Sequence, residues 1–307
     1  MFAQKLINSS SRSQNSLPLL YPLRNFSLWS MKKDPDLEAA LSRTRRWIVK
    51  NQIKNMILRC PDQAASVKYL QKKFRTLDLQ VKEEESVKDM QEPFYVERLA
   101  KLLMMSTNQR INVVKLNELR RNLRFPDDYI IRILPRYPNM FRLVNHTGRK
   151  SSMEIELLSW NPDFAVSAVE ASALERGCSP CFSCSLPSSW VQSWERFHEF
   201  NAIPYVSPYV CASGLVEGTM EMEKRTVGLV HELLSLTLWK KMSIVKLGHF
   251  KKELGLPDKL NVLLLKHPGI FYVSNIYTVL LKDAYNGSEL KEMDPLVVVK
   301  GKFGELM

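Results

Sequence analysis

Apolar residues in the middle of the chain recur first at helical spacing and then in short runs, which predicts a defined series of elements. Residues 94–105 (FYVERLAKLLMM) are amphipathic at helical spacing, whereas Ile111 to Val114 form a β-branched run typical of a strand. The turn Phe125-Pro126-Asp127-Asp128 separates two further helices, because proline fixes its own φ angle and aspartate accepts hydrogen bonds near a helix start. The pattern predicts a helix, a strand, two helices and two strands, at residues 94–105, 111–114, 115–124, 128–136, 140–144 and 153–158.

A second copy of this pattern follows in the C-terminal half. Residues 246–273 (KLGHFKKELGLPDKLNVLLLKHPGIFYV) repeat residues 115–143 (KLNELRRNLRFPDDYIIRILPRYPNMFRL), with one residue fewer before His267. The predicted elements occupy residues 225–238, 243–245, 247–254, 259–266, 270–274 and 276–281. Their order is that of a winged helix-turn-helix domain. We therefore expect an α+β, mainly helical fold, with tandem winged helix-turn-helix-like modules and short β-hairpins.

The composition changes along the chain, and these changes predict its organisation. Residues 161–222 are rich in proline and also in aromatic residues, so we expect this connector to be packed as a subdomain rather than disordered. Residues 67–74 (VKYLQKKF) resemble the helix that opens each repeat, which indicates either a degenerate module or a helical lead-in. The expected segments are a transit peptide (1–30), an N-terminal basic helical region (31–92), module 1 (93–160), the connector (161–222), module 2 (223–285) and a C-terminal tail (286–307).

The first 30 residues have the composition of an organelle transit peptide. They contain no Asp or Glu, seven serines and the basic residues Lys5, Arg12 and Arg24. The stretch Arg24-Asn25-Phe26-Ser27 resembles a mitochondrial processing site. We expect a mitochondrial protein, with the chloroplast as the alternative location and an untargeted N-terminal tail as the structural alternative.

The charge balance favours a polyanionic partner. The formal net charge is +12 and the isoelectric point is about 9.4. A nucleic acid or an anionic membrane surface would satisfy such an excess, and a solvated basic surface is the structural alternative. No stretch of about 18 apolar residues occurs, so we expect no membrane-spanning helix and no membrane partner.

Basic residues recur at matched positions of the two repeats, as Arg120-Arg121 and Lys251-Lys252. Helices that carry such groups can place them against phosphates, where counterion release supplies affinity that does not depend on sequence. A solvated helix face is the alternative for each residue, but recurrence in both repeats favours binding. The candidate RNA-binding residues are Arg43, Arg45, Arg46, Lys50, Lys54, Arg120, Arg121, Arg124, Arg132, Arg136, Lys251, Lys252, Lys259 and Lys266.

Patterns typical of catalysis or metal binding are weak. Cys178, Cys181 and Cys184 have a spacing that suggests zinc, but a structural zinc site needs four ligands, and only Cys211 or His198 would complete it. The chain has no Gly-x-Ser-x-Gly, no phosphate-binding Gly-rich loop and no His-Glu-x-x-His. We expect a protein that is not an enzyme and has no catalytic residues, no metal, no cofactor and no small-molecule substrate.

Long segments of the chain resemble the plant organelle RNA recognition domain family. The resemblance covers roughly residues 35–307 and lies mainly in CFSCSLPSSW (181–190), ERFHEFNAIPYVSPY (195–209), EMEKRTVGLVHELLSLTLWKKMSIVKLGHF (221–250), LPDKLNVLLLKHPGIFYVSN (256–275) and DPLVVVKGKFGELM (294–307). It implies an organelle protein that binds RNA and promotes the splicing of group II introns. Two features depart from the family: the hairpin SNIYTVLL (274–281) is shorter than the usual wing, and the acids Glu83-Glu84-Glu85 interrupt the N-terminal unit.

The combined expectation is a mitochondrial RNA-binding protein that holds intron RNA through the two modules and the basic segment 43–59. Catalysis would belong to the intron, and other splicing factors are further expected partners. Two other functions stay open. One is a DNA-binding winged-helix protein of the organelle nucleoid or transcription machinery, and the other is a scaffold that recruits splicing factors through residues 161–222.

Overall fold

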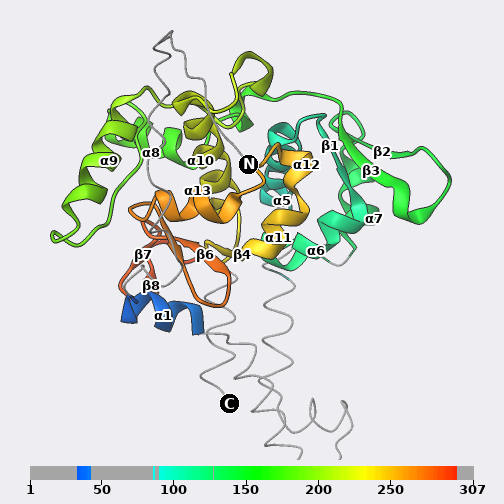
Figure 1. The fold of residues 1–307 in the computed structure, drawn as a ribbon. Helices are drawn as coiled ribbons and strands as arrows, with labels where there is room; N and C mark the ends of the chain where they lie inside the picture. The colour runs from blue at the N-terminus through cyan, green and yellow to red at the C-terminus, as the bar shows by residue number, and fades with distance from the viewer. Residues whose placement is uncertain (1–32, 43–85, 87–89, 127, 296–307) are drawn as a thin grey trace, which may run out of the picture.

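Two small antiparallel sheets, each accompanied by helices, form the body of the protein (Figure 1). The computed structural model describes residues 33–42, 86, 90–126 and 128–295. The fold is α+β, as the sequence predicts, with helices as the larger part. The basic segment 43–59 and the transit peptide predicted for residues 1–30 lie outside the described residues.

The first module contains the elements that its sequence pattern predicts, in the predicted order. The side chain of Asn112 caps α6 by accepting a hydrogen bond from the backbone nitrogen of Val114 at 2.9 Å. The helix predicted over residues 128–136 becomes a 3-10 turn in its second half, because Pro135 has no N–H to continue an α-helix. The elements are α5 (Glu92–Met105), β1 (Arg110–Asn112), α6 (Val113–Leu123), α7 (Tyr129–Arg132), the 3-10 helix η3 (Leu134–Arg136), β2 (Phe141–Asn145) and β3 (Met153–Leu157).

The second module repeats this arrangement. Its elements are α10 (Met220–Ser235), β4 (Lys241–Ser243), α11 (Ile244–His249), α12 (Lys251–Leu254), α13 (Leu260–Lys266), β5 (Phe271–Val273) and β6 (Thr278–Leu281). The strands are ordered β1-β3-β2 in the first sheet and β4-β6-β5 in the second, so the two modules share one topology. The helix predicted over residues 247–254 is divided at Phe250 into α11 and α12. The duplication predicted from the repeat is therefore visible in three dimensions.

The segment between the modules contributes its aromatic side chains to the main core. It contains α8 (Ala168–Arg176) and α9 (Val191–Ala202), with short 3-10 turns at Pro162–Phe164 and Ala212–Gly214. Phe182 and Phe200 are buried and stack with their ring centroids 5.9 Å apart. They belong to the same hydrophobic cluster as Leu99 of α5 and Leu233 of α10. Burial of these rings explains why a Pro-rich segment of this length is ordered.

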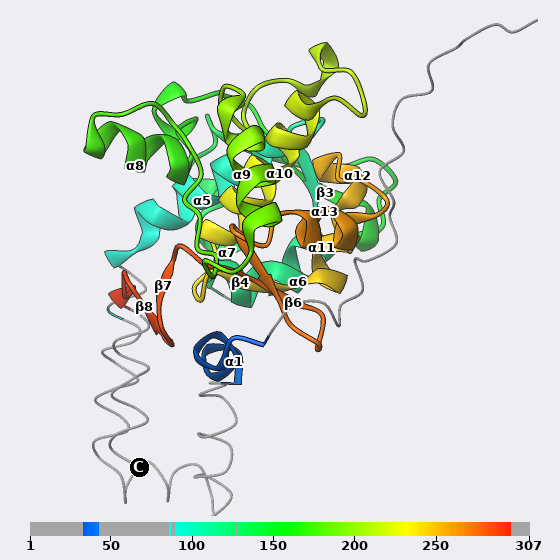
Figure 2. The same cartoon turned by 60° about the vertical axis from the view of Figure 1, so that its left-hand side comes forward.

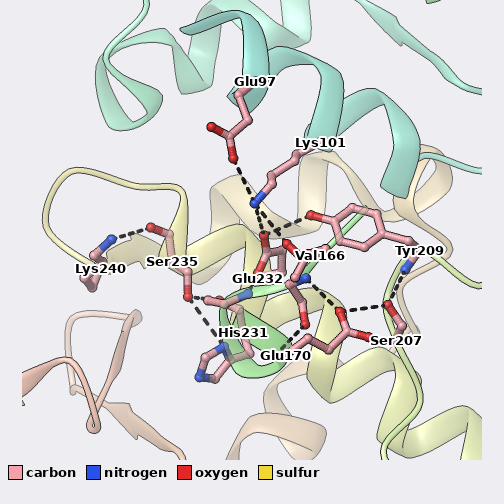
Figure 3. Close-up of polar contacts among 12 residues, drawn as sticks. Glu97, Lys101, Val166, Glu170, Ser207, Tyr209, His231, Glu232, Ser235 and Lys240 are labelled. Carbon is pink, nitrogen blue, oxygen red and sulfur yellow. Dashed lines mark hydrogen bonds and ion pairs between the residues drawn. The ribbon is translucent and has the colours of Figure 1, made fainter. Parts of the chain in front are cut away.

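A buried polar network joins the connector to both modules (Figure 3). The carboxylate of Glu232, in α10, accepts hydrogen bonds from the backbone nitrogen of Ala168 at 2.6 Å and from the hydroxyl of Tyr209 at 2.9 Å. The ammonium group of Lys101, in α5, lies 3.6 Å from the same carboxylate and donates to the carbonyl of Val166 at 3.0 Å. Glu232 therefore links the first module, the connector and the second module.

An N-terminal helix, α1 (Pro35–Ser42), packs against the second sheet on the side away from the main core (Figure 2). The ammonium group of Lys241 donates to the carbonyl of Ala40 at 2.7 Å, and the hydroxyl of Tyr272 donates to Glu38 at 2.6 Å. A small apolar cluster lies between α1 and the second sheet. After β6 the chain forms a two-stranded hairpin, β7 (Tyr285–Asn286) and β8 (Glu289–Leu290), which contributes to this cluster.

Candidate nucleic-acid interface

Helices α6 and α11–α12 of the two modules pack against each other in opposite directions. Lys115, at the start of α6, forms an ion pair with Glu253, at the end of α12. Conversely, Lys246, near the start of α11, donates to the side-chain oxygen of Asn122, at the end of α6, at 3.2 Å. Lys246 is the repeat equivalent of Lys115, and Glu253 is the equivalent of Asn122. Each contact is therefore the counterpart of the other.

Further contacts have the same reciprocal relation. The backbone nitrogen of Thr107 donates to the carbonyl of Glu253 at 2.8 Å, and the equivalent Leu238 donates to the carbonyl of Asn122 at 2.9 Å. Glu118 and its own equivalent, His249, 131 residues later, meet at 2.6 Å. An interface has two-fold symmetry when residue i of one part contacts residue j of the other, and the equivalents of i and j make the same contact in the reverse direction. The two modules are thus related by a local two-fold axis that passes near the Glu118–His249 pair.

This symmetry places equivalent side chains on one solvent-facing surface. The core side of the helix pair is formed by fully buried residues such as Leu116 and its equivalent Leu247. A two-fold axis that exchanges two antiparallel helices runs perpendicular to the plane containing them, so equivalent exposed residues lie on the same side of that plane. We call this side the dyad surface; its residues are Val114, Asn117, Arg121, Val245, Gly248 and Lys252, all exposed.

The predicted RNA-binding residues of module 1 differ in their exposure and in whether they form ion pairs with acidic side chains. Arg121 is exposed on the dyad surface, whereas Arg120 is partly buried. The side chain of Arg124 is only 5% exposed and forms an ion pair with Asp294. Arg132 and Arg136 both face Glu92, at 3.5 Å and 2.5 Å. Arg124 is therefore fixed within the fold, and Glu92 partly neutralises Arg132 and Arg136.

A similar division applies in module 2. Lys252 and Lys259 are exposed, and neither has an ion pair with an acidic side chain of the described chain. Lys251 pairs with Asp258, and Lys266 pairs with Glu223 at 3.0 Å. The candidates Arg43, Arg45, Arg46, Lys50 and Lys54 lie outside the described residues.

Glu223, the partner of Lys266, also contacts a histidine. His267 contacts the other oxygen of Glu223 at 2.9 Å. The hydrogen bond from His267, followed by that from Lys266, lowers the pKa of Glu223 to about 2 despite its partial burial. Glu223 is thus a charged carboxylate at neutral pH, and it compensates part of the positive charge of Lys266.

Lys115 and Lys246, which join α6 to α11 and α12, are outside the set of RNA-binding residues that the sequence predicts. Their signal was the Lys-Leu pair that begins both copies of the repeat. Arg110 and Arg142 are also outside this predicted set. Both donate to Glu156, at the centre of the first sheet, and these hydrogen bonds, that of Arg110 first, lower the pKa of the carboxyl group. The sheet face therefore presents a mixed charge.

One cluster of side chains has the composition of a catalytic triad but not its geometry. His231 lies 3.1 Å from Asp283, and Ser235 is four residues further along α10. The hydroxyl of Ser235 donates to the backbone carbonyl of His231 at 2.9 Å and lies 3.5 Å from the ring nitrogen. Because its proton is directed to the carbonyl, Ser235 is not activated by the imidazole as a nucleophile would be.

The part of the chain that the structure describes holds neither a cluster of metal ligands nor a membrane-spanning helix. Within it, no group of three or more His, Cys, Asp or Glu side chains is arranged to hold a metal ion. Cys178 is exposed, and Cys181 and Cys184 are partly exposed free thiols. Among the same residues, no helix combines the length and the apolar character that crossing a bilayer requires.

Comparisons with known proteins agree with the resemblance noted in the sequence. The family model for the plant organelle RNA recognition domain matches residues 32–83 and 79–307. Three similar proteins come from Arabidopsis thaliana. The chain is 36% identical over 244 residues to "Protein WHAT'S THIS FACTOR 1 homolog, chloroplastic", which covers 73% of this chain and 46% of that protein. It is 31% identical to "Protein ROOT PRIMORDIUM DEFECTIVE 1" over 76% and 62% of the two chains, and 29% identical to "Protein WHAT'S THIS FACTOR 9, mitochondrial" over 69% and 57%.

The chain spans about half the length of the first of these curated relatives. No solved structure matches it.

Proposed function

Because the chain belongs to the plant organelle RNA recognition domain family, we propose that it binds intron RNA in mitochondria and promotes the splicing of group II introns. The family match carries this proposal, since it extends over nearly the whole chain from residue 32. The net charge of +12 is consistent with a polyanionic ligand. In this proposal the protein has no catalytic residues of its own, and the intron RNA performs the reaction.

We propose that both modules are winged-helix-like. Each has the order helix, strand, two helices and two strands, and each sheet places its first strand beside its last. The hairpins β2–β3 and β5–β6 would then be the wings, and α7 and α13 the second helices of the helix-turn-helix pairs. The turn between β5 and β6 spans only residues 274–277, so the second wing offers little surface to a ligand.

The proposed phosphate contacts are the exposed members of the predicted basic set that have no ion pair with a described acidic side chain. These are Arg121, Lys252 and Lys259, because their charges are not offset by a described acidic side chain. Arg120, Arg132, Arg136, Lys251 and Lys266 are proposed to contribute to the surrounding positive field, and Arg124 to hold the fold.

The proposed location rests on two observations. The relatives include proteins named as chloroplastic and as mitochondrial. The first 30 residues lack acidic side chains and contain the segment Arg24-Asn25-Phe26-Ser27, which resembles a mitochondrial processing site. We therefore propose mitochondrial import.

Sequencing of organelle RNA from a plant line that lacks the protein tests the splicing function. We expect one or a few mitochondrial group II introns to be retained, because a protein that stabilises the folded intron is needed for its excision. Other mitochondrial transcripts of the same line serve as the internal control for general effects on RNA. Normal excision of every mitochondrial and chloroplast intron would contradict the proposal.

A further inference from the structure

The two-fold relation of the modules bears on the form of RNA that the dyad surface binds. We infer that this surface docks on double-stranded RNA, with Arg121 contacting one strand and Lys252 the other. The inference rests on the proposed RNA-binding function and specifies the structure of the ligand. Three observations carry it: the symmetry of the surface, the separation of its basic groups and the position of an acidic group between them.

Symmetry is the first observation. The strands of a nucleic acid duplex are antiparallel and are related by two-fold axes perpendicular to the helix axis, so a protein with a two-fold axis can present equal groups to both strands. The reciprocal pairs Lys115–Glu253 and Lys246–Asn122 define such an axis within this chain. Arg121 and Lys252 are equivalent positions in the repeat and therefore lie symmetrically about it.

The separation of the two basic groups suits a groove between two strands. Arg121 lies three residues beyond Glu118, and Lys252 lies three residues beyond His249, where the axis passes. With a rise of about 1.5 Å per residue and packed helices about 8–10 Å apart, their Cα atoms are on the order of 10–15 Å from each other. Long side chains extend this span. The minor groove of A-form RNA is wide and shallow, and proteins recognise it through phosphates and 2′-hydroxyl groups.

The charge pattern favours a duplex over a single strand. Glu118 and His249 are joined at the axis, between Arg121 and Lys252, with side chains 40% and 50% exposed. A single strand running from one basic group to the other would bring phosphates over the Glu118 carboxylate, where like charges repel. A duplex with its minor groove centred on the axis keeps its phosphates at the two sides. Gly248 adds no side chain at this surface, which permits close approach.

Fluorescence anisotropy with the full chain tests the inference. The probes are an RNA duplex of about 20 base pairs and each of its strands alone, at about 150 mM salt. We expect the wild-type protein to bind the duplex at least about tenfold more tightly than either strand. Arg121→Glu and Lys252→Glu should each weaken duplex binding by about tenfold and make its salt dependence shallower by about one unit of slope.

Matched variants separate this effect from a general loss of charge or fold. Arg176→Glu makes the same charge change at the end of α8, away from the helix pair in both views (Figures 1 and 2), and should leave duplex affinity unchanged. Glu118→Gln should strengthen single-strand binding more than duplex binding. Circular dichroism of each variant is the control for correct folding.

Two results would overturn the inference, and a third would also contradict the proposed RNA-binding function. The docking geometry is wrong if the duplex binds no more tightly than its strands, or if only one of the two charge reversals weakens duplex binding; RNA binding itself would then stand. If neither form of RNA binds the wild-type protein at all, the proposed function fails as well.

Discussion

Replacing Glu232 with leucine is expected to lower the free energy of unfolding by about 3–5 kcal/mol, the range for removing one partner of a buried ion pair. Glu232 is 1% exposed and accepts hydrogen bonds from Ala168 and Tyr209. Its loss leaves the backbone N–H of Ala168 and the hydroxyl of Tyr209 without their acceptor, and it removes one of the two carboxylates near the ammonium group of Lys101. Because these groups belong to the first module and the connector, the substitution loosens three parts of the fold together (Figure 3).

Urea denaturation followed by circular dichroism measures this effect. Glu175→Leu is the matched control, because Glu175 is exposed on α8 and a substitution at such a position changes stability by no more than about 0.5 kcal/mol. A loss below about 1 kcal/mol for Glu232→Leu would show that the network does not join the modules as described.

Replacing Asp294 with alanine is the second change with a large expected effect, about 3–5 kcal/mol of unfolding free energy. Asp294 forms ion pairs with Arg124 and, at 3.8 Å, with Arg98, whose side chains are 5% and 12% exposed. Two nearly buried guanidinium groups would lose the carboxylate that they share. A buried charge without a partner is far more costly than an exposed one.

The same denaturation measurement applies, with Asp163→Ala as the control at an exposed carboxylate. An RNA-binding assay adds a second readout. Because Arg124 is directed to Asp294, Arg124→Met should reduce stability while the folded protein retains its RNA affinity within about twofold. A large loss of RNA affinity in a stably folded Arg124→Met variant would instead place Arg124 in the RNA interface.

The order of elements was accessible from the sequence because it depends on local chemistry. Helical spacing of apolar residues, the Pro-Asp turns at Pro126 and Pro257 and the β-branched strands specify each element within a few positions. The two copies of the repeat predict the same order of elements. The errors were local: α7 ends early because of Pro135, and α11 and α12 divide at Phe250.

The surface was less accessible, because it depends on contacts between residues far apart in the chain. Nothing near Arg124 in the sequence indicates that Asp294 will neutralise it. Likewise, Lys115 and Glu253 belong to different modules, and their pairing appears only when α6 and α12 pack. The composition indicates the sign of the charge, whereas tertiary packing determines that Arg121 and Lys252 are exposed and that Arg124 is not.

The proposed function requires that the protein bind RNA more tightly than DNA, and a filter-binding comparison tests this preference most directly. The full chain is titrated at physiological salt against intron RNA from the organelle and against duplex DNA of the same sequence. We predict tighter binding to the RNA, with an affinity that falls steeply as salt increases, because phosphate contacts release counterions. Tighter binding to the duplex DNA would contradict the account and support a DNA-binding winged-helix protein instead.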